Sequence, residues 1–73
     1  MMRFVQIGVG VRGRQWSRVV REEPGAQMVG YVARRKEVLE AQVKAFGDEG
    51  VACFTDLAQA LDETKPDALI IVT

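Results

Sequence analysis

Histidine is absent from this chain of 73 residues, cysteine occurs once and proline twice. Without histidine, the chain lacks the side chain that most often gains and loses protons near neutral pH, and a zinc site is not expected. A single cysteine, Cys53, excludes an internal disulfide framework. Because Cys53 lies in an apolar stretch, we expect a small buried side chain without a redox role.

Long apolar runs are also absent. No stretch reaches the roughly 18 apolar residues of a membrane-spanning helix, and no secretory signal is recognisable. We therefore expect a cytoplasmic protein with no membrane partner. A hydrophobic content of 48% beside 27% charged residues predicts a folded globular domain rather than disorder.

The net charge is zero, but the two signs are unevenly distributed. Residues 1–36 carry eight Lys/Arg and two Asp/Glu, whereas residues 37–73 carry two and eight. A basic first half suits an anionic ligand, although solvated helix faces of different sign explain the same asymmetry. Nucleic acid is not the expected partner, because the pI is about 6.2 and aromatic residues are not interleaved with the basic ones.

The motif G-x-G-x-x-G begins at Gly8, directly after an apolar strand pattern and before a helical pattern. In a dinucleotide-binding βαβ unit, the first glycine permits a tight turn and the second lets a diphosphate approach bare backbone. The third lets the helix pack close to the sheet. These roles fall to Gly8, Gly10 and Gly13. Free N–H groups at the helix start, where Val11 and Arg12 stand, are expected to face the diphosphate. The Arg12 side chain either adds a charge contact or extends into solvent.

Strand and helix patterns alternate along the chain. The predicted strands cover residues 3–7, 26–33, 51–54 and 68–72, and the predicted helices cover residues 11–23, 36–46 and a segment from a cap at Thr55 or Asp56 to Thr64. Such alternation implies an α/β fold with a Rossmann-like parallel sheet of about four strands, in the order 3-2-1-4, with helices on both faces. In this order the chain continues on one side of the first strand up to strand 3 and on the other side with strand 4. A ligand crevice is expected at this change of direction, with the glycine motif on one side and Thr73 on the other.

Apolar spacing predicts the buried face of each helix. The expected core contacts are Trp16, Val19 and Val20 in the first helix, Leu39, Val43 and Phe46 in the second, and Leu57, Ala60 and Leu61 in the third. Trp16 is expected to pack against the sheet rather than to stack on a ligand.

The end of the second predicted strand bears on the choice of dinucleotide. An Asp or Glu roughly 20 residues after the glycine motif usually binds the ribose hydroxyls of NAD. This chain instead reads Ala33-Arg34-Arg35-Lys36. A small residue makes room for a 2′-phosphate, and a guanidinium binds one bidentately. We expect NADP to be preferred, with NAD possible, Arg34 on the 2′-phosphate and Arg35 as second candidate. The alternative is three solvated cations, although these are unfavourable at a helix start.

These features together resemble the N-terminal part of the Gfo/Idh/MocA oxidoreductases. The matching segments are Phe4–Gly13, Pro24–Ala26 with Val29–Ala33, Phe54–Leu57 and Pro66–Thr73. The resemblance implies a two-domain NAD(P)-dependent dehydrogenase that transfers a hydride between nicotinamide and a carbon of a sugar, cyclitol or related compound.

The resemblance also implies a Glu-Lys-Pro segment, with a catalytic lysine, and a C-terminal substrate-binding sheet. No residue of this chain matches that lysine, because Lys36, Lys44 and Lys65 lie in other elements. We therefore expect residues 1–73 to be a partial dinucleotide-binding domain that has no catalytic residue and is inactive alone. The alternative is a non-catalytic nucleotide-binding or oligomerisation module, and the downstream reading frame would distinguish the two.

A terminal fourth strand would leave an apolar sheet edge over residues 68–72. Unpaired backbone groups on such an edge recruit another chain. We therefore expect self-association.

Overall fold

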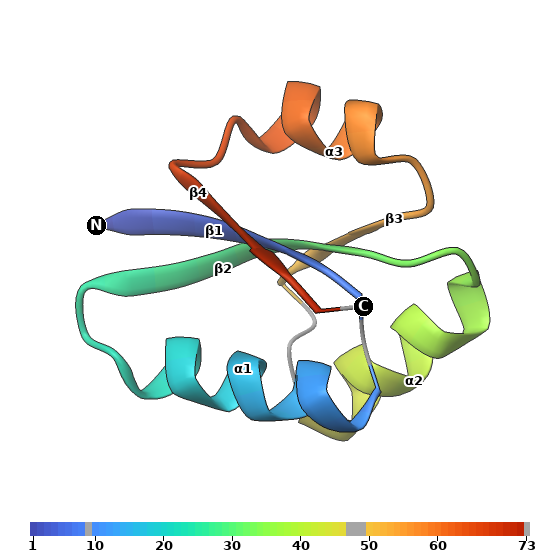
Figure 1. Cartoon of the computed structure of the whole chain (residues 1–73), viewed down its shortest axis with the longest axis horizontal. Helices are drawn as coiled ribbons and strands as arrows, with labels where there is room; N and C mark the ends of the chain where they lie inside the picture. Colours follow the sequence, from blue (N-terminus) through green and yellow to red (C-terminus); the bar gives the residue numbers. More distant parts are fainter. Residues whose placement is uncertain (9, 47–49, 73) are drawn as a thin grey trace.

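The computed structural model describes residues 1–8, 10–46 and 50–72. Its elements are β1 (Met2–Ile7), α1 (Val11–Glu22), β2 (Ala26–Val32), α2 (Lys36–Phe46), β3 (Ala52–Phe54), α3 (Leu57–Thr64) and β4 (Ala68–Ile71) (Figure 1). Every predicted element is present, with bounds within one residue of those expected. Of the two candidate caps of α3, Asp56 is the one used.

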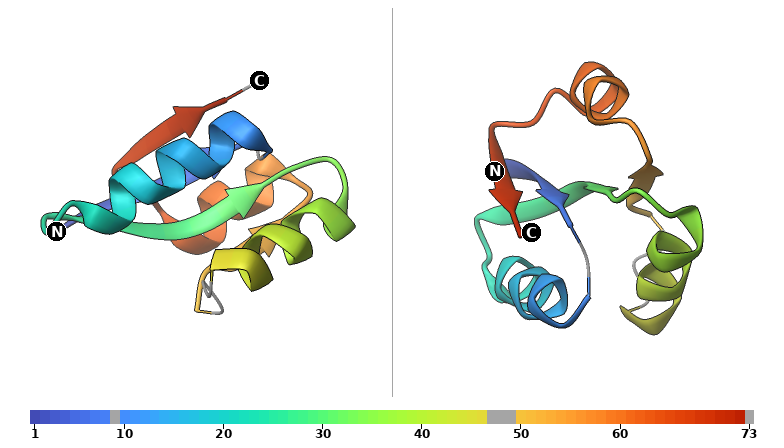
Figure 2. Two further views of the ribbon diagram at one scale, coloured as in Figure 1. Left: turned by 90° about the horizontal axis from the view of Figure 1, so that it is seen from below. Right: turned by 45° about the vertical axis from the view of Figure 1, so that its right-hand side comes forward.

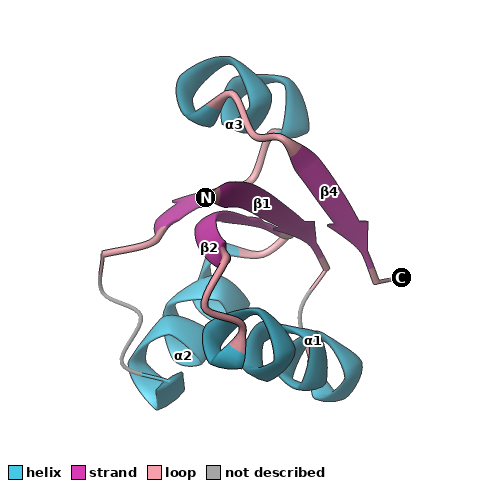
Figure 3. Ribbon diagram, turned by 90° about the vertical axis from the view of Figure 1, so that its left-hand side faces the viewer, coloured by secondary structure: helices cyan, strands magenta, loops and turns pink. Residues whose placement is uncertain are grey.

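The four strands form one parallel sheet in the order β3-β2-β1-β4, which confirms the predicted topology. Helices α1 and α2 cover one face, and α3 covers the other (Figures 2 and 3). The register pairs Ile7 with both Val32 and Ile71, and Val32 with Phe54. The carboxyl ends of all four strands therefore meet at one edge of the sheet, below the start of the glycine motif.

The core contains a buried layer on each face of β2. Val5, Val32, Phe54 and Ala60 form one cluster between the sheet and α3. Tyr31 is 1% exposed and points to the opposite face, because successive strand residues alternate. Burial on both faces is what the apolar second strand predicted.

The predicted core face of α1 is wrong at two positions out of three. Val20 is buried, but Trp16 is 49% exposed and Val19 is 54% exposed. The face toward the sheet runs instead through Gly13 and Ser17, both buried. These small residues keep α1 close to β2, whereas the two larger apolar side chains border a hollow of about 200 Å³ over β1 and β4.

The third helix follows the predicted pattern in part. Ala60 is buried and Leu61 half-buried, but Leu57 is 39% exposed. Its expected place in the core is taken by Thr64, whose hydroxyl donates to the Ala60 carbonyl at 2.7 Å. A threonine that satisfies its own hydroxyl within the helix can be buried at little energetic cost.

In the second helix, Leu39 is 1% exposed, as predicted, and Val43 is half-buried. The side chain of Phe46 lies outside the described part of the structure. Cys53 is exposed, so the prediction of a buried thiol is wrong. It belongs to β3, which ends the sheet on that side, and an outer strand has neighbours on one side only.

Strand β4 ends the described sheet on the opposite side and pairs there with β1. Two of its side chains are exposed, Leu69 at 41% and Ile71 at 67%. Within the described residues, none of the helices has the length and apolar character needed to cross a membrane.

Candidate functional site

The first glycine of the motif lies where three strands converge. The Gly8 N–H donates to the Val32 carbonyl at 2.8 Å, and the Val72 N–H donates to the Ile7 carbonyl at 2.8 Å. Gly8 has φ +102°, and a Cβ there would overlap the carbonyl oxygen of Val72. The turn out of β1 therefore requires glycine both for its backbone angle and for the close approach of the chain after β4.

The other two glycines of the motif differ in their surroundings. Gly10 is exposed at φ +104°, and a Cβ there would meet nothing within 4 Å. Gly13 is buried, and a Cβ there would lie 2.9 Å from Gln6 Nε2 and 3.1 Å from the Gly8 carbonyl oxygen. Gly10 thus leaves bare backbone open to solvent at the start of α1, while Gly13 allows close packing below it.

The N-terminus of α1 is suited to an anion. Gly10 is its N-cap, no side chain caps it, and no acidic residue stands in its first turn. By contrast, the Asp56 carboxylate accepts from the Ala58 N–H at 3.0 Å at the start of α3, and Glu37 stands in the first turn of α2. Among the described helices, α1 alone has no carboxylate of its own at its N-cap or in its first turn, although Glu37 of α2 lines a small hollow together with Gly10 and Arg14.

A hollow of about 410 Å³ lies beside Gly8 at the carboxyl ends of the strands. Its walls are formed by Ile7, Gly8, Val32, Ala33, Arg34, Thr55, Leu57 and Val72. These residues are mostly apolar, with one cation and no acid, and the volume lies within the range of small-molecule sites. An aromatic base with a phosphate at its margin matches such walls.

The two arginines after β2 are placed differently. Arg34 lines the hollow and makes no hydrogen bond or ion pair with another described residue. Arg35 is not among the lining residues, and its Nε lies 3.9 Å from Glu37 Oε2, with both side chains at least three-quarters exposed. The guanidinium available to an anion in the hollow is therefore that of Arg34.

The remaining predicted site residues lie around this arrangement. Val11 begins α1, and Arg12 is exposed in the first turn. Ala33 is half-buried, and its N–H donates to the Phe54 carbonyl at 3.1 Å. Thr73 lies outside the described residues. The role of each of these residues toward a ligand stays a prediction.

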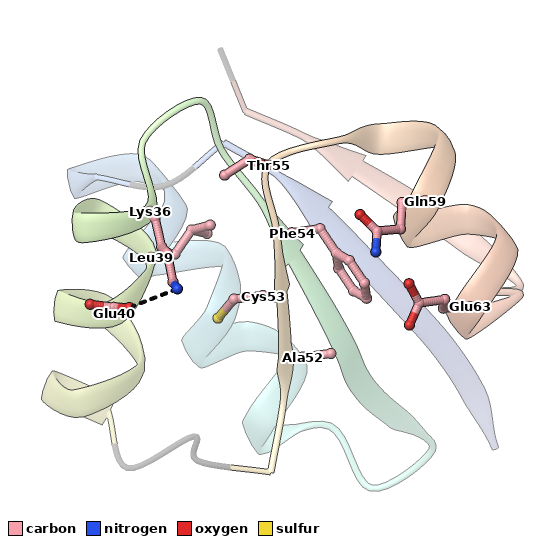
Figure 4. Close-up of a pocket in the computed structure, with 9 residues that line it drawn as sticks. All are labelled: Lys36, Leu39, Glu40, Ala52, Cys53, Phe54, Thr55, Gln59 and Glu63. Atoms are coloured by element: carbon pink, nitrogen blue, oxygen red, sulfur yellow. Dashed lines mark ion pairs between the residues drawn. The ribbon is translucent and has the colours of Figure 1, made fainter.

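A second hollow, of about 530 Å³, runs along β3 between α2 and α3 (Figure 4). Its cation, Lys36, lies 3.8 Å from a Glu40 oxygen, and Glu63 lines the opposite wall. Partial desolvation of the Cys53 thiol raises its pKa, and the negative charge of the nearby Glu40 raises it further. This excess of carboxylates would repel a diphosphate, so the hollow is not a dinucleotide site.

Sequence reasoning missed three buried polar residues below the glycine motif: Gln6, Ser17 and Gln42, at 0%, 3% and 2% exposure. The Gln6 amide donates from Nε2 to the carbonyls of Gly8 at 2.9 Å and Gly13 at 3.0 Å. Ser17 Oγ lies 2.8 Å from the Gly13 carbonyl and receives a hydrogen bond from Gln42 at 3.2 Å. A glutamine between the apolar residues Val5 and Ile7 of β1 was the available signal.

Comparisons with known proteins agree with this architecture. The model of the Gfo/Idh/MocA family, described as an oxidoreductase family with an NAD-binding Rossmann fold, matches residues 2–73. Among solved structures, myo-inositol 2-dehydrogenase from Lactobacillus plantarum superposes with a TM-score of 0.79 at 27% identity. The match covers 99% of this chain and 21% of that dehydrogenase. A search of curated proteins finds no match.

Proposed function

This chain belongs to the Gfo/Idh/MocA oxidoreductase family, which has an NAD-binding Rossmann fold, and we propose that it binds NADP in preference to NAD. The observation that carries the proposal is the adjacency of two features. The N-terminus of α1, which has no carboxylate of its own, lies behind the bare backbone of Gly10, and an acid-free hollow beside Gly8 contains Arg34. One site suits a diphosphate and the other a phosphorylated adenosine.

Different residues would bind different parts of the dinucleotide. Backbone N–H groups at the start of α1 would hold the diphosphate, where Gly10 leaves room for it. Ala33 leaves space beside the adenosine ribose, and the Arg34 guanidinium would bind its 2′-phosphate through paired hydrogen bonds. Arg12 adds positive charge on the exposed side of the first turn. The mostly apolar walls of the hollow would contact the base.

When bound, the nicotinamide supplies an acceptor or donor of a hydride. We propose that these residues serve an oxidoreductase, which exchanges a hydride between the nicotinamide and a hydroxyl or carbonyl substrate such as a sugar or cyclitol. Support comes from the family and from the likeness to myo-inositol 2-dehydrogenase. The matched region is 21% of the length of that dehydrogenase.

Isothermal titration of the full chain with NADP, NAD and 2′,5′-ADP tests the cofactor assignment. We expect NADP to bind about tenfold or more tightly than NAD, because a hydrogen bond to a charged group contributes about 1.5–3 kcal/mol. The ratio should shrink as salt is added, since Arg34 is exposed. Tighter binding of NAD than of NADP would refute the 2′-phosphate assignment, and no binding of any of the three would refute the proposed function.

A second candidate function is an oligomerisation module, and the exposed apolar side chains on β4, the outer strand of the described sheet, favour it. In the described sheet, β4 pairs with β1 only, and Leu69 and Ile71 are exposed. We propose that this edge pairs with a second copy of the chain.

Light scattering at high concentration should give a mass above the 8.1 kDa of one chain. Ile71→Lys should lower that mass, because a lysine on an edge strand opposes pairing. The matched control is Val38→Lys, which changes an exposed apolar position on α2, a helix that lies away from β4 (Figure 2). A monomeric mass at every concentration would contradict the proposal.

A further inference from the structure

We propose that Gln6, Ser17 and Gln42 form a positioning relay that holds the glycine motif in the conformation that accepts a diphosphate. The inference rests on the proposed function, because it assigns a role toward the same ligand. The three residues come from β1, α1 and α2, and all are at least 97% buried. They connect the motif to both helices on that face of the sheet.

Gln6 uses its whole donor capacity on the motif. Its side-chain amide carries two hydrogens, and Nε2 lies 2.9 Å from the Gly8 carbonyl and 3.0 Å from the Gly13 carbonyl. One side chain therefore links the carbonyl groups of the first and last glycines of the motif through hydrogen bonds. Both carbonyl oxygens are thereby bound to the buried amide, whereas a carbonyl oxygen that faced a diphosphate would repel it.

Gln6 also explains why the third glycine has no side chain in this fold. A Cβ at Gly13 would lie 2.9 Å from Gln6 Nε2, which is closer than real contacts allow. The bare Cα of Gly13 is thus the surface against which the Gln6 amide lies. The two residues are thus in direct contact, and a side chain at Gly13 would displace the Gln6 amide.

Ser17 and Gln42 fix the orientation of the Gln6 amide. Ser17 Oγ lies 3.1 Å from Gln6 Oε1 and 2.8 Å from the Gly13 carbonyl, and its single hydrogen serves one of them at a time. Gln42 Nε2 donates to Ser17 Oγ at 3.2 Å. This contact leaves the hydroxyl hydrogen of Ser17 directed toward the motif rather than toward α2.

Folding stability alone does not explain why these three buried side chains are polar. Gln42 Oε1 is buried and has no hydrogen-bond partner among the described residues, and a buried unpaired acceptor destabilises a fold. Apolar residues of similar shape at these positions would avoid that penalty. Retention of three buried polar side chains directly below the ligand loop is what a positioning role explains.

The test compares two ligands on the full chain. ADP-ribose contains the diphosphate, whereas 2′-AMP contains the adenosine and 2′-phosphate alone. For Gln6→Met, which keeps the side-chain length but removes both donors, we expect ADP-ribose affinity to fall about tenfold, the equivalent of one to two hydrogen bonds. Affinity for 2′-AMP should stay within about twofold. Gln27→Met, an exposed glutamine on β2, is the matched control and should change neither.

Ser17→Ala provides a second, smaller perturbation and should lower ADP-ribose affinity about threefold, again without affecting 2′-AMP. Circular dichroism verifies that each variant is folded at the temperature of titration. If Gln6→Met does not fold, Ser17→Ala decides the question alone. Unchanged ADP-ribose affinity in folded variants, or equal losses for both ligands, would overturn the relay while leaving the proposed function intact. Failure of the unaltered chain to bind ADP-ribose would overturn the relay, and failure to bind both ADP-ribose and 2′-AMP would overturn the proposed function as well.

Discussion

Gly8→Ala should strongly destabilise the chain. A non-glycine residue at φ +102° is strained by about 1–2 kcal/mol. The new methyl group would also overlap the Val72 carbonyl, which is backbone held by the hydrogen bond from Val72 to Ile7. We expect a total loss of about 3 kcal/mol or more in the free energy of unfolding. A domain of this size has only about 4–10 kcal/mol to lose.

Urea unfolding followed by circular dichroism at 222 nm measures this effect. Gly25→Ala is the matched control, because its Cβ would meet only the flexible end of Glu23, 3.9 Å away. That variant should unfold within about 0.5 kcal/mol of the unaltered chain. If Gly8→Ala unfolded at the same urea concentration as Gly25→Ala, the close approach of β1 and the chain after β4 would be wrong.

The elements and the strand order were predictable because each depends on local signals. Apolar runs bounded by turn residues mark the strands, and the Pro24-Gly25 pair ends α1 in the structure as in the sequence. Helices between strands then force a parallel sheet, and the handedness of the crossovers leaves few orders for four strands. Nothing in this reasoning needs a contact between distant residues.

Side-chain burial was less predictable, because it depends on where the sheet stops. Trp16 and Val19 have the spacing of a core face, yet they lie over β1 and the outermost strand β4, where the described sheet offers no further partner. Ser17 is buried despite its polarity because its hydroxyl donates to the Gly13 carbonyl and accepts a hydrogen bond from Gln42. Hydropathy ranks residues one at a time and does not detect such mutual satisfaction.

For the candidate site, the sequence indicated the glycines and Arg34. It did not indicate that Thr55 and Leu57 line the same hollow. Thr55 and Leu57 reach the hollow because α3 begins directly above the ends of β1 and β2. Arg34 and Arg35 look equivalent in sequence, and only the fold separates them. One lines the hollow, whereas the other lies near Glu37.

The different positions of Arg34 and Arg35 predict a large effect on cofactor binding when Arg34 is replaced. Arg34→Gln should weaken NADP binding by about 10- to 100-fold, because it removes a charge-assisted contact of about 1.5–3 kcal/mol. NAD lacks the 2′-phosphate, so its affinity should stay within about twofold. Titration calorimetry of both dinucleotides at one ionic strength measures the two constants, since salt screens an exposed guanidinium.

Two control variants separate a specific contact from a general loss of positive charge. Arg18→Gln removes an exposed guanidinium from α1 and should leave the NADP to NAD ratio unchanged. Arg35→Gln should reduce the ratio only slightly, since that guanidinium lies near Glu37 rather than in the hollow. Arg34→Lys should give an intermediate ratio, because an ammonium keeps the charge but not the planar pair of donors. Equal losses of NADP and NAD in Arg34→Gln would instead place Arg34 on the adenine, which both dinucleotides share, and the 2′-phosphate assignment would then be wrong.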